Sequence, residues 1–94
     1  MIILAIKINI YIPFSKSIKD KRNITRKFKD KIKFKFNVNA AELPLHSNKR
    51  SCIGIVLCNK DKTILEKVLT KIIEYANFNF LDVIDKIEYN YFYF

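Results

Sequence analysis

The chain has little of several residue types on which catalytic and metal sites depend. It holds one glycine, two prolines, two cysteines, one histidine and no tryptophan. The single glycine excludes a glycine-rich backbone cradle for a phosphoryl group. The single histidine, His46, has no clear serine and aspartate partners, and it cannot complete a metal-binding set. We therefore expect no enzyme activity, no metal and no cofactor, and we interpret His46 as a solvated loop residue.

The remaining candidates for chemistry are equally sparse. Cys52 and Cys58 lie six residues apart on one predicted strand, which separates them by about 20 Å. A disulfide requires Cα atoms within about 7 Å, so both are predicted to be free, small, buried residues. Asp82 and Asp85 differ in strand parity, so they are predicted to point to opposite faces. Paired carboxylates are therefore not expected either.

Long apolar runs are also missing, although half of the residues are hydrophobic. Lys, Asn or Asp interrupts every run well before the roughly 18 residues of a membrane span. The start of the chain, MIILAIKINIYI, has no basic region or small-residue cleavage site and alternates like a strand. We expect a cytoplasmic protein that forms one domain over residues 1–94.

Nearly all of the net positive charge lies in one segment. Residues 16–35 hold ten Lys and Arg against Asp20 and Asp30, which is +8 of the total +9. Five apolar side chains fall within one third of a helical wheel: Ile18, Ile24, Phe28, Ile32 and Phe36. Five basic side chains form a stripe that is placed opposite them: Lys19, Arg22, Arg26, Lys29 and Lys33. The pattern predicts an amphipathic helix with a basic stripe, and an AT-rich coding bias is the alternative source of its lysines.

The rest of the chain divides into short elements. Residues 2–12 alternate as a strand that Pro13 ends, and Ser15 or Ser17 caps the basic helix, which begins near Ile18. Residues 31–40 also alternate with period two, so the end of the helix is ambiguous, and we place it near Phe36. Further strands are predicted at 36–43, ended by Pro44, at 51–58 around a close packing point at Gly54, and at 79–89. A second helix is predicted at 61–77, capped by Asn59 or Asp61, and an aromatic tail at 90–94 either lengthens the last strand or packs against a neighbour.

The order β-α-β-β-α-β predicts an α+β ferredoxin-like sandwich, in which two helices cover one face of a four-stranded antiparallel sheet. Right-handed crossovers place the first and third strands in the centre. These two strands are the most hydrophobic, as central strands should be. The sequence thus predicts both the fold class and the strand order.

Two motifs resemble those of the YlxP-like family, also known as DUF503. Residues 17–22, S-I-K-D-K-R, are similar to the family's S-L-K-D-K-R, and residues 36–42 are similar to its F-N-V-x-x-A-E. Arg50 and Gly54 also match in spacing, whereas the loop 45–50 is about one residue shorter and has no Trp. The resemblance implies a ferredoxin-like fold and a small bacterial cytosolic protein without established enzymatic activity. It also implies an association with ribosome assembly or RNA binding, because the family's genes commonly neighbour those of translation factors such as ribosome-binding factor A.

These observations favour a non-catalytic RNA-binding protein that contacts phosphates of ribosomal RNA or the small ribosomal subunit. The candidate binding residues are basic: Lys16, Lys19, Lys21, Arg22, Arg26, Lys29, Lys33, Lys49 and Arg50. Lys21 falls near the apolar sector, so it either extends over the edge of the core or pairs with Asp20 or Glu42. The alternative function is a protein-interaction or self-associating module, a homodimer formed through the open sheet face, the last strand or the tail.

Overall fold

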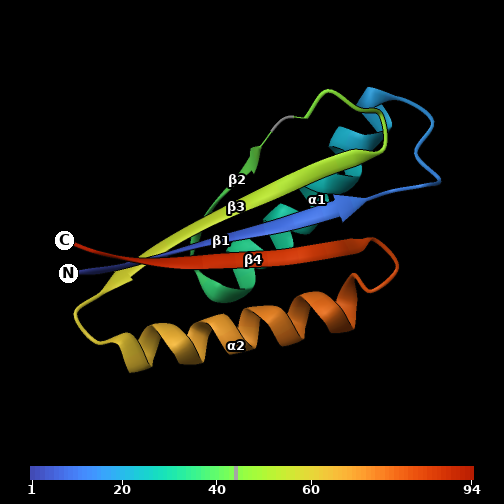
Figure 1. Cartoon of the computed structure of the whole chain (residues 1–94). Helices are drawn as coiled ribbons and strands as arrows, with labels where there is room; N and C mark the ends of the chain where they lie inside the picture. Colours follow the sequence, from blue (N-terminus) through green and yellow to red (C-terminus); the bar gives the residue numbers. More distant parts are fainter. Residues whose placement is uncertain (44) are drawn as a thin grey trace.

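The computed structural model describes residues 1–43 and 45–94, so the predicted break at Pro44 lies outside the described residues. Two helices pack on one face of a four-stranded sheet (Figure 1). The elements in chain order are β1 (Ile2–Tyr11), α1 (Ile18–Phe36), β2 (Asn39–Leu43), β3 (Arg50–Asn59), α2 (Lys62–Asn79) and β4 (Ile84–Tyr93). The predicted α+β ferredoxin-like fold is confirmed. No helix of the described chain is long and apolar enough to cross a membrane.

The strand order is β2-β3-β1-β4, and all neighbouring strands are antiparallel. The two most hydrophobic strands therefore occupy the centre, as predicted. Ile8 of β1 lies opposite Ile53 of β3 and Ile87 of β4. The two chain ends meet where β1 pairs with β4 (Figure 1), and the Met1 amino group donates to the Phe94 carbonyl oxygen over 2.6 Å.

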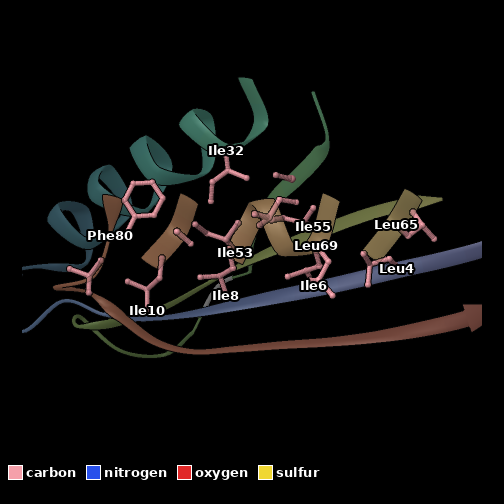
Figure 2. Close-up of a cluster of buried hydrophobic side chains, with 14 of the residues drawn as sticks. Leu4, Ile6, Ile8, Ile10, Ile32, Ile53, Ile55, Leu65, Leu69 and Phe80 are labelled. Carbon is pink, nitrogen blue, oxygen red and sulfur yellow. The ribbon is translucent and has the colours of Figure 1, made fainter. Parts of the chain in front are cut away.

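The hydrophobic core lies between the sheet and the two helices (Figure 2). Every second residue from Leu4 of β1 to Ile12, just after β1, is buried on this side, because side chains alternate between the faces of a strand. α1 contributes Ile32, and α2 contributes Leu65, Leu69, Ile72 and Ala76. The opposite face of the sheet is covered by no helix in the described chain.

Caps explain where α1 begins and ends. The Ser17 hydroxyl accepts a hydrogen bond from the Asp20 amide over 3.1 Å, so Ser17 and not Ser15 is the N-cap. Asn37 closes the helix in the left-handed conformation, with φ of 52°, which asparagine tolerates better than most residues. The predicted helix end at Phe36 is confirmed. Asn37, in its left-handed conformation, separates the helix from the next strand. β2 therefore begins at Asn39, and the predicted strand start at Phe36 is wrong by three residues.

The last two elements differ more from their predicted bounds. Asp61 caps α2 by accepting from the Thr63 amide over 3.0 Å, and the helix continues to Asn79, beyond the predicted end at residue 77. Phe80 is buried and stacks on Phe28 of α1 with ring centroids 4.2 Å apart. A turn follows, so β4 begins at Ile84 and the predicted start at residue 79 is wrong. β4 then runs to Tyr93, which pairs residues 90–93 with β1.

The small residues of β3 behave differently from one another. A Cβ atom on Gly54 would lie 3.0 Å from Leu43 Cδ1, so Gly54 is the close packing point that the sequence predicts. Both cysteines are free; Cys52 is buried, but Cys58 is exposed. The prediction of two buried cysteines is therefore wrong for Cys58, which lies near the end of β3. Burial raises the pKa of the Cys52 thiol, and the charge of Lys7 partly opposes this rise.

Candidate nucleic-acid interface

The outer face of α1 carries a group of exposed cations. The helix turns Ile32 into the core (Figure 2), and Ile24 and Phe28 are partly buried against that core. Six exposed basic residues of α1 have no carboxylate within 4 Å in residues 1–43 and 45–94. One of them, Lys35, lies over the Tyr75 ring at 5.8 Å. The other five are Lys19, Arg22, Lys27, Lys31 and Lys33. We call these five residues the α1 cation group. Their charges are available to an external anion.

Two members of the predicted stripe instead hold β2. Glu42 lies 3.2 Å from Arg26 Nε and 3.9 Å from Lys29 Nζ. Lys29 also pairs with Asp30 at 3.1 Å, and its side chain is only 19% exposed. The stripe therefore does not lie opposite the apolar face along its whole length; part of it follows the boundary between α1 and β2. Arg26 and Lys29 have an internal electrostatic role that a helical wheel cannot show.

Lys21 is buried and bonded to the backbone of the protein itself. Only 4% of its surface is exposed, and its ammonium group donates to the carbonyl oxygens of Leu45 at 3.1 Å and Ser47 at 2.5 Å. The two predicted pairings, with Asp20 and Glu42, are wrong, because the connection before β3 folds over α1 and supplies backbone acceptors instead. Lys21 thereby holds this connection against the helix.

Lys49 and Arg50 also contact groups of the protein itself. Lys49 Nζ donates to the carbonyl oxygens of Pro13 at 2.7 Å and Ser15 at 3.0 Å, which ties two connections together. Arg50 pairs with Asp85 at 3.1 Å and covers the Tyr11 ring at 4.9 Å. Tyr11 alternates with the core residues of β1, so Arg50 lies on the open face of the sheet, away from α1.

Lys16 is exposed just before α1, and its amide donates to Asp20 Oδ2 over 3.1 Å. Of the nine predicted binding residues, Lys16 and three members of the α1 cation group remain exposed and free of ion pairs within the described chain: Lys16, Lys19, Arg22 and Lys33. The other five contact carbonyl oxygens or carboxylates of the protein itself.

The sequence reasoning missed three residues of this face. Lys27 and Lys31 are exposed one turn apart, and the ring of Phe34, 91% exposed, follows them on the same side of the helix. A helical wheel predicts that all three are exposed, because they fall outside the apolar third of the circumference. An exposed aromatic ring among lysines is typical of surfaces on which unpaired bases stack.

The open face of the sheet is the second surface feature. Small residues on three neighbouring strands, Ala5, Ala41 and Gly54, leave a hollow of about 540 Å³. Exposed apolar side chains line it as well: Leu43, Val56, Tyr89 and Phe92. Its polar part includes Glu88, whose pKa is lowered chiefly by a 2.9 Å hydrogen bond from the Asn9 amide group. The hollow contains no cluster of metal-ligating side chains among the described residues.

Comparison with known proteins adds a family and a fold. One family model, described as "Protein of unknown function (DUF503)", matches residues 3–88. No curated protein matches the chain. Among solved structures, "De novo designed protein Foldit4" is similar with a TM-score of 0.61 and 13% sequence identity, over 99% of this chain and 97% of that chain. At this identity the likeness concerns the fold alone.

Proposed function

The chain belongs to the DUF503 family, and from this premise we propose that it is a non-catalytic protein that binds the phosphate backbone of structured RNA. The observation that carries the proposal is the α1 cation group, five exposed charges on one helix without carboxylate partners in the described chain. A stable protein gains nothing from gathering like charges on one surface, because they repel one another. An external polyanion removes this repulsion.

The mechanism is electrostatic. Lys19 and Lys33 are 14 residues apart, which is about 21 Å along a helix, so the group spans several phosphates of an RNA strand. Each contact releases condensed counterions, and this release drives binding without reading the sequence. Phe34 offers a face on which one unpaired base stacks. The protein positions RNA and carries out no reaction.

Ribosomal RNA, in the small subunit or during its assembly, is the RNA that we propose. Its phosphates lie on the surface of a large folded RNA, which suits a protein that recognises backbone and shape. The family's association with translation factors supports the same choice. The proposal includes a cytoplasmic location, where such RNA is found.

The test is binding to 30S subunits and to free ribosomal RNA over a range of salt concentrations. The variant replaces Lys27, Lys31 and Lys33 with Glu, because these lysines make no ion pair in the described chain. Arg26 and Lys29 are left unchanged, since a glutamate there would face Glu42. We expect the variant to bind at least about a hundredfold more weakly and to show a shallower salt slope, because several phosphate contacts are lost.

A matched control places the same charge change on the other helix. Lys60, Lys67 and Lys71 are exposed on or beside α2, and replacing them with Glu also changes the net charge by −6. This control should bind RNA within about threefold of the wild type, since only long-range attraction is reduced. Equal loss in both variants would show that net charge alone governs binding, and the proposed interface would be wrong.

A second candidate function is self-association through the open sheet face. The apolar side chains around the hollow, among them Val56 and Phe92, are half exposed, which a monomer usually avoids on a contiguous surface. Another copy of the chain that covers this face would bury them. β4 also lies at the edge of the sheet, where a second chain finds unpaired backbone groups.

Sedimentation velocity over a range of protein concentrations tests this second function. Deleting residues 90–94 is not a suitable variant, because residues 90–93 pair with β1. Replacing Val56 and Phe92 with Asp leaves the backbone pairing in place. A dimer that becomes a monomer in this variant supports self-association, whereas a wild type that is monomeric at every concentration contradicts it.

A further inference from the structure

A pocket distinct from the outer face of α1 lies between the first half of this helix and the residues that lead into β3. Its volume is about 770 Å³, and its lining combines α1 side chains with Leu45–Asn48 and Ser51. The S-I-K-D-K-R motif contributes Ile18, Lys21 and Arg22 to this lining. The size is in the range of sites for small organic ligands and is much larger than a single ion requires.

The pocket contains a buried cation without a counter-ion. Lys21 donates two of its three N–H groups to backbone carbonyl oxygens, and no carboxylate of the described residues lies within 4 Å of its nitrogen. Burial of an ammonium group is unfavourable unless an opposite charge compensates it. The only acidic side chain of the described lining, Glu42, is already engaged by Arg26 and Lys29. The electrostatics of the pocket therefore favour an anion.

Two further groups offer donors to such an anion. Ser51 is 95% buried, since 5% of its surface is exposed, and its hydroxyl makes no hydrogen bond with residues 1–43 or 45–94. Ser51 lines the pocket, so this donor is accessible to a ligand there. Arg22 and His46, both exposed, lie in the same lining and add a guanidinium fork and a ring N–H.

We propose that this pocket binds the phosphate monoester of a nucleotide. A phosphate monoester carries a charge of about −1.5 to −2 and three acceptor oxygens, which matches several donors better than a carboxylate with one charge and two oxygens. The apolar lining from Ile18 and Leu45 accommodates the attached sugar and base. The ligand is either a free mononucleotide or the 5′-phosphate end of an RNA. Of the α1 cation group, only Arg22 lines the pocket.

Amide chemical shifts during titration with adenosine 5′-monophosphate test the proposal. We expect saturable shifts in Ser47–Ser51 and the first turns of α1, and no saturable shifts with adenosine. Arg22→Gln and Ser51→Ala should each lower the affinity for the monophosphate about tenfold, as expected for the loss of one charge-assisted or buried hydrogen bond. The same spectra report whether each variant is folded, so a loss of binding is not confused with unfolding.

Two RNA oligonucleotides that differ only in a 5′-phosphate or 5′-hydroxyl identify the source of the ligand. If only the phosphorylated oligonucleotide displaces adenosine 5′-monophosphate, the natural ligand is an RNA end. If neither oligonucleotide displaces it, the ligand is a free mononucleotide. Both results support the pocket. The Lys27, Lys31 and Lys33 variant should retain monophosphate binding within about twofold, which separates this site from the RNA interface. The absence of saturable shifts, or shifts unchanged by both pocket substitutions, would overturn the proposal.

Discussion

The two helices lie on the same face of the sheet but are held there by different forces. α2 buries Leu65, Leu69, Ile72 and Ala76, all apolar. α1 buries Lys21, Thr25 and Ile32, of which only one is apolar. The Thr25 hydroxyl donates to the Lys21 carbonyl oxygen of its own helix over 2.8 Å, and the Lys21 ammonium holds the connection before β3. α2 is therefore anchored by apolar burial, whereas α1 adds the hydrogen bonds of Lys21 and the ion pairs with Glu42 to a smaller apolar contact.

The two helices also differ in the charges that they expose. The charges of α2 nearly cancel: Lys62, Lys67 and Lys71 stand against Glu66 and Glu74. α1 has nine basic residues against Asp20 and Asp30, of which some hold the fold and the α1 cation group remains exposed. The helix that buries fewer apolar side chains is thus the one that carries the exposed charges without carboxylate partners in the described chain.

The largest loss of stability is expected from the apolar anchor of α2. Ile72→Ala should lower the free energy of unfolding by about 2–5 kcal/mol, because Ile72 is fully buried and its truncation leaves a cavity. Urea denaturation followed by circular dichroism measures this. Ile64→Ala, at an exposed position of the same helix, is the control and should cost less than about 1 kcal/mol. A loss at Ile72 no larger than that at Ile64 would contradict the packing described for α2.

A smaller loss is expected from the polar anchor of α1. Lys21→Met should lower the free energy of unfolding by about 1–3 kcal/mol, since the Leu45 and Ser47 carbonyl oxygens lose their donor while the side chain keeps its length. Lys27→Met, on the exposed side of the same helix, should change it by less than about 0.5 kcal/mol. If Lys21→Met proved more destabilising than Ile72→Ala, the contrast between the helices would fail.

The ion pairs between α1 and β2 should contribute still less. Glu42→Gln removes the partner of Arg26 and Lys29, and we expect a loss below about 1 kcal/mol that shrinks further as salt is added, because Arg26 is largely exposed. Glu74→Gln, exposed on α2 and without an ion pair in the described chain, provides the comparison. A salt-independent loss at Glu42 would show that the pair is shielded from solvent.

The smallest expected effect concerns the two cysteines of β3, and alkylation of their thiols measures it without any substitution. Cys58 is exposed and Cys52 is buried with a raised pKa, so iodoacetamide at neutral pH should modify Cys58 much faster. Mass spectrometry of peptides over time measures the two rates, and both should become equal in denaturing urea. Equal rates in native buffer would mean that the sheet opens around Cys52 far more often than its burial suggests.

Much of the fold follows from periodicity and caps that are visible in the sequence. Alternation from Ile2 to Ile12 predicts β1, and Ser17 with Asp20 predicts the start of α1. The errors occur where a local pattern competes with a distant contact. Residues 79–83 look like the start of a strand, yet Phe80 packs on Phe28 of α1 and Val83 is buried, so β4 is delayed to Ile84.

The candidate site divides in the same way. The sequence by itself determined the excess of positive charge in residues 16–35 and its placement on a helix, because both depend only on composition and the helical repeat. Only the tertiary structure decided which of those charges are available. Glu42 comes from β2 to engage Arg26 and Lys29, and the Leu45 and Ser47 carbonyl oxygens reach Lys21 across 24 and 26 residues of chain. Such partners are set by how the chain folds back on itself, which no local pattern contains.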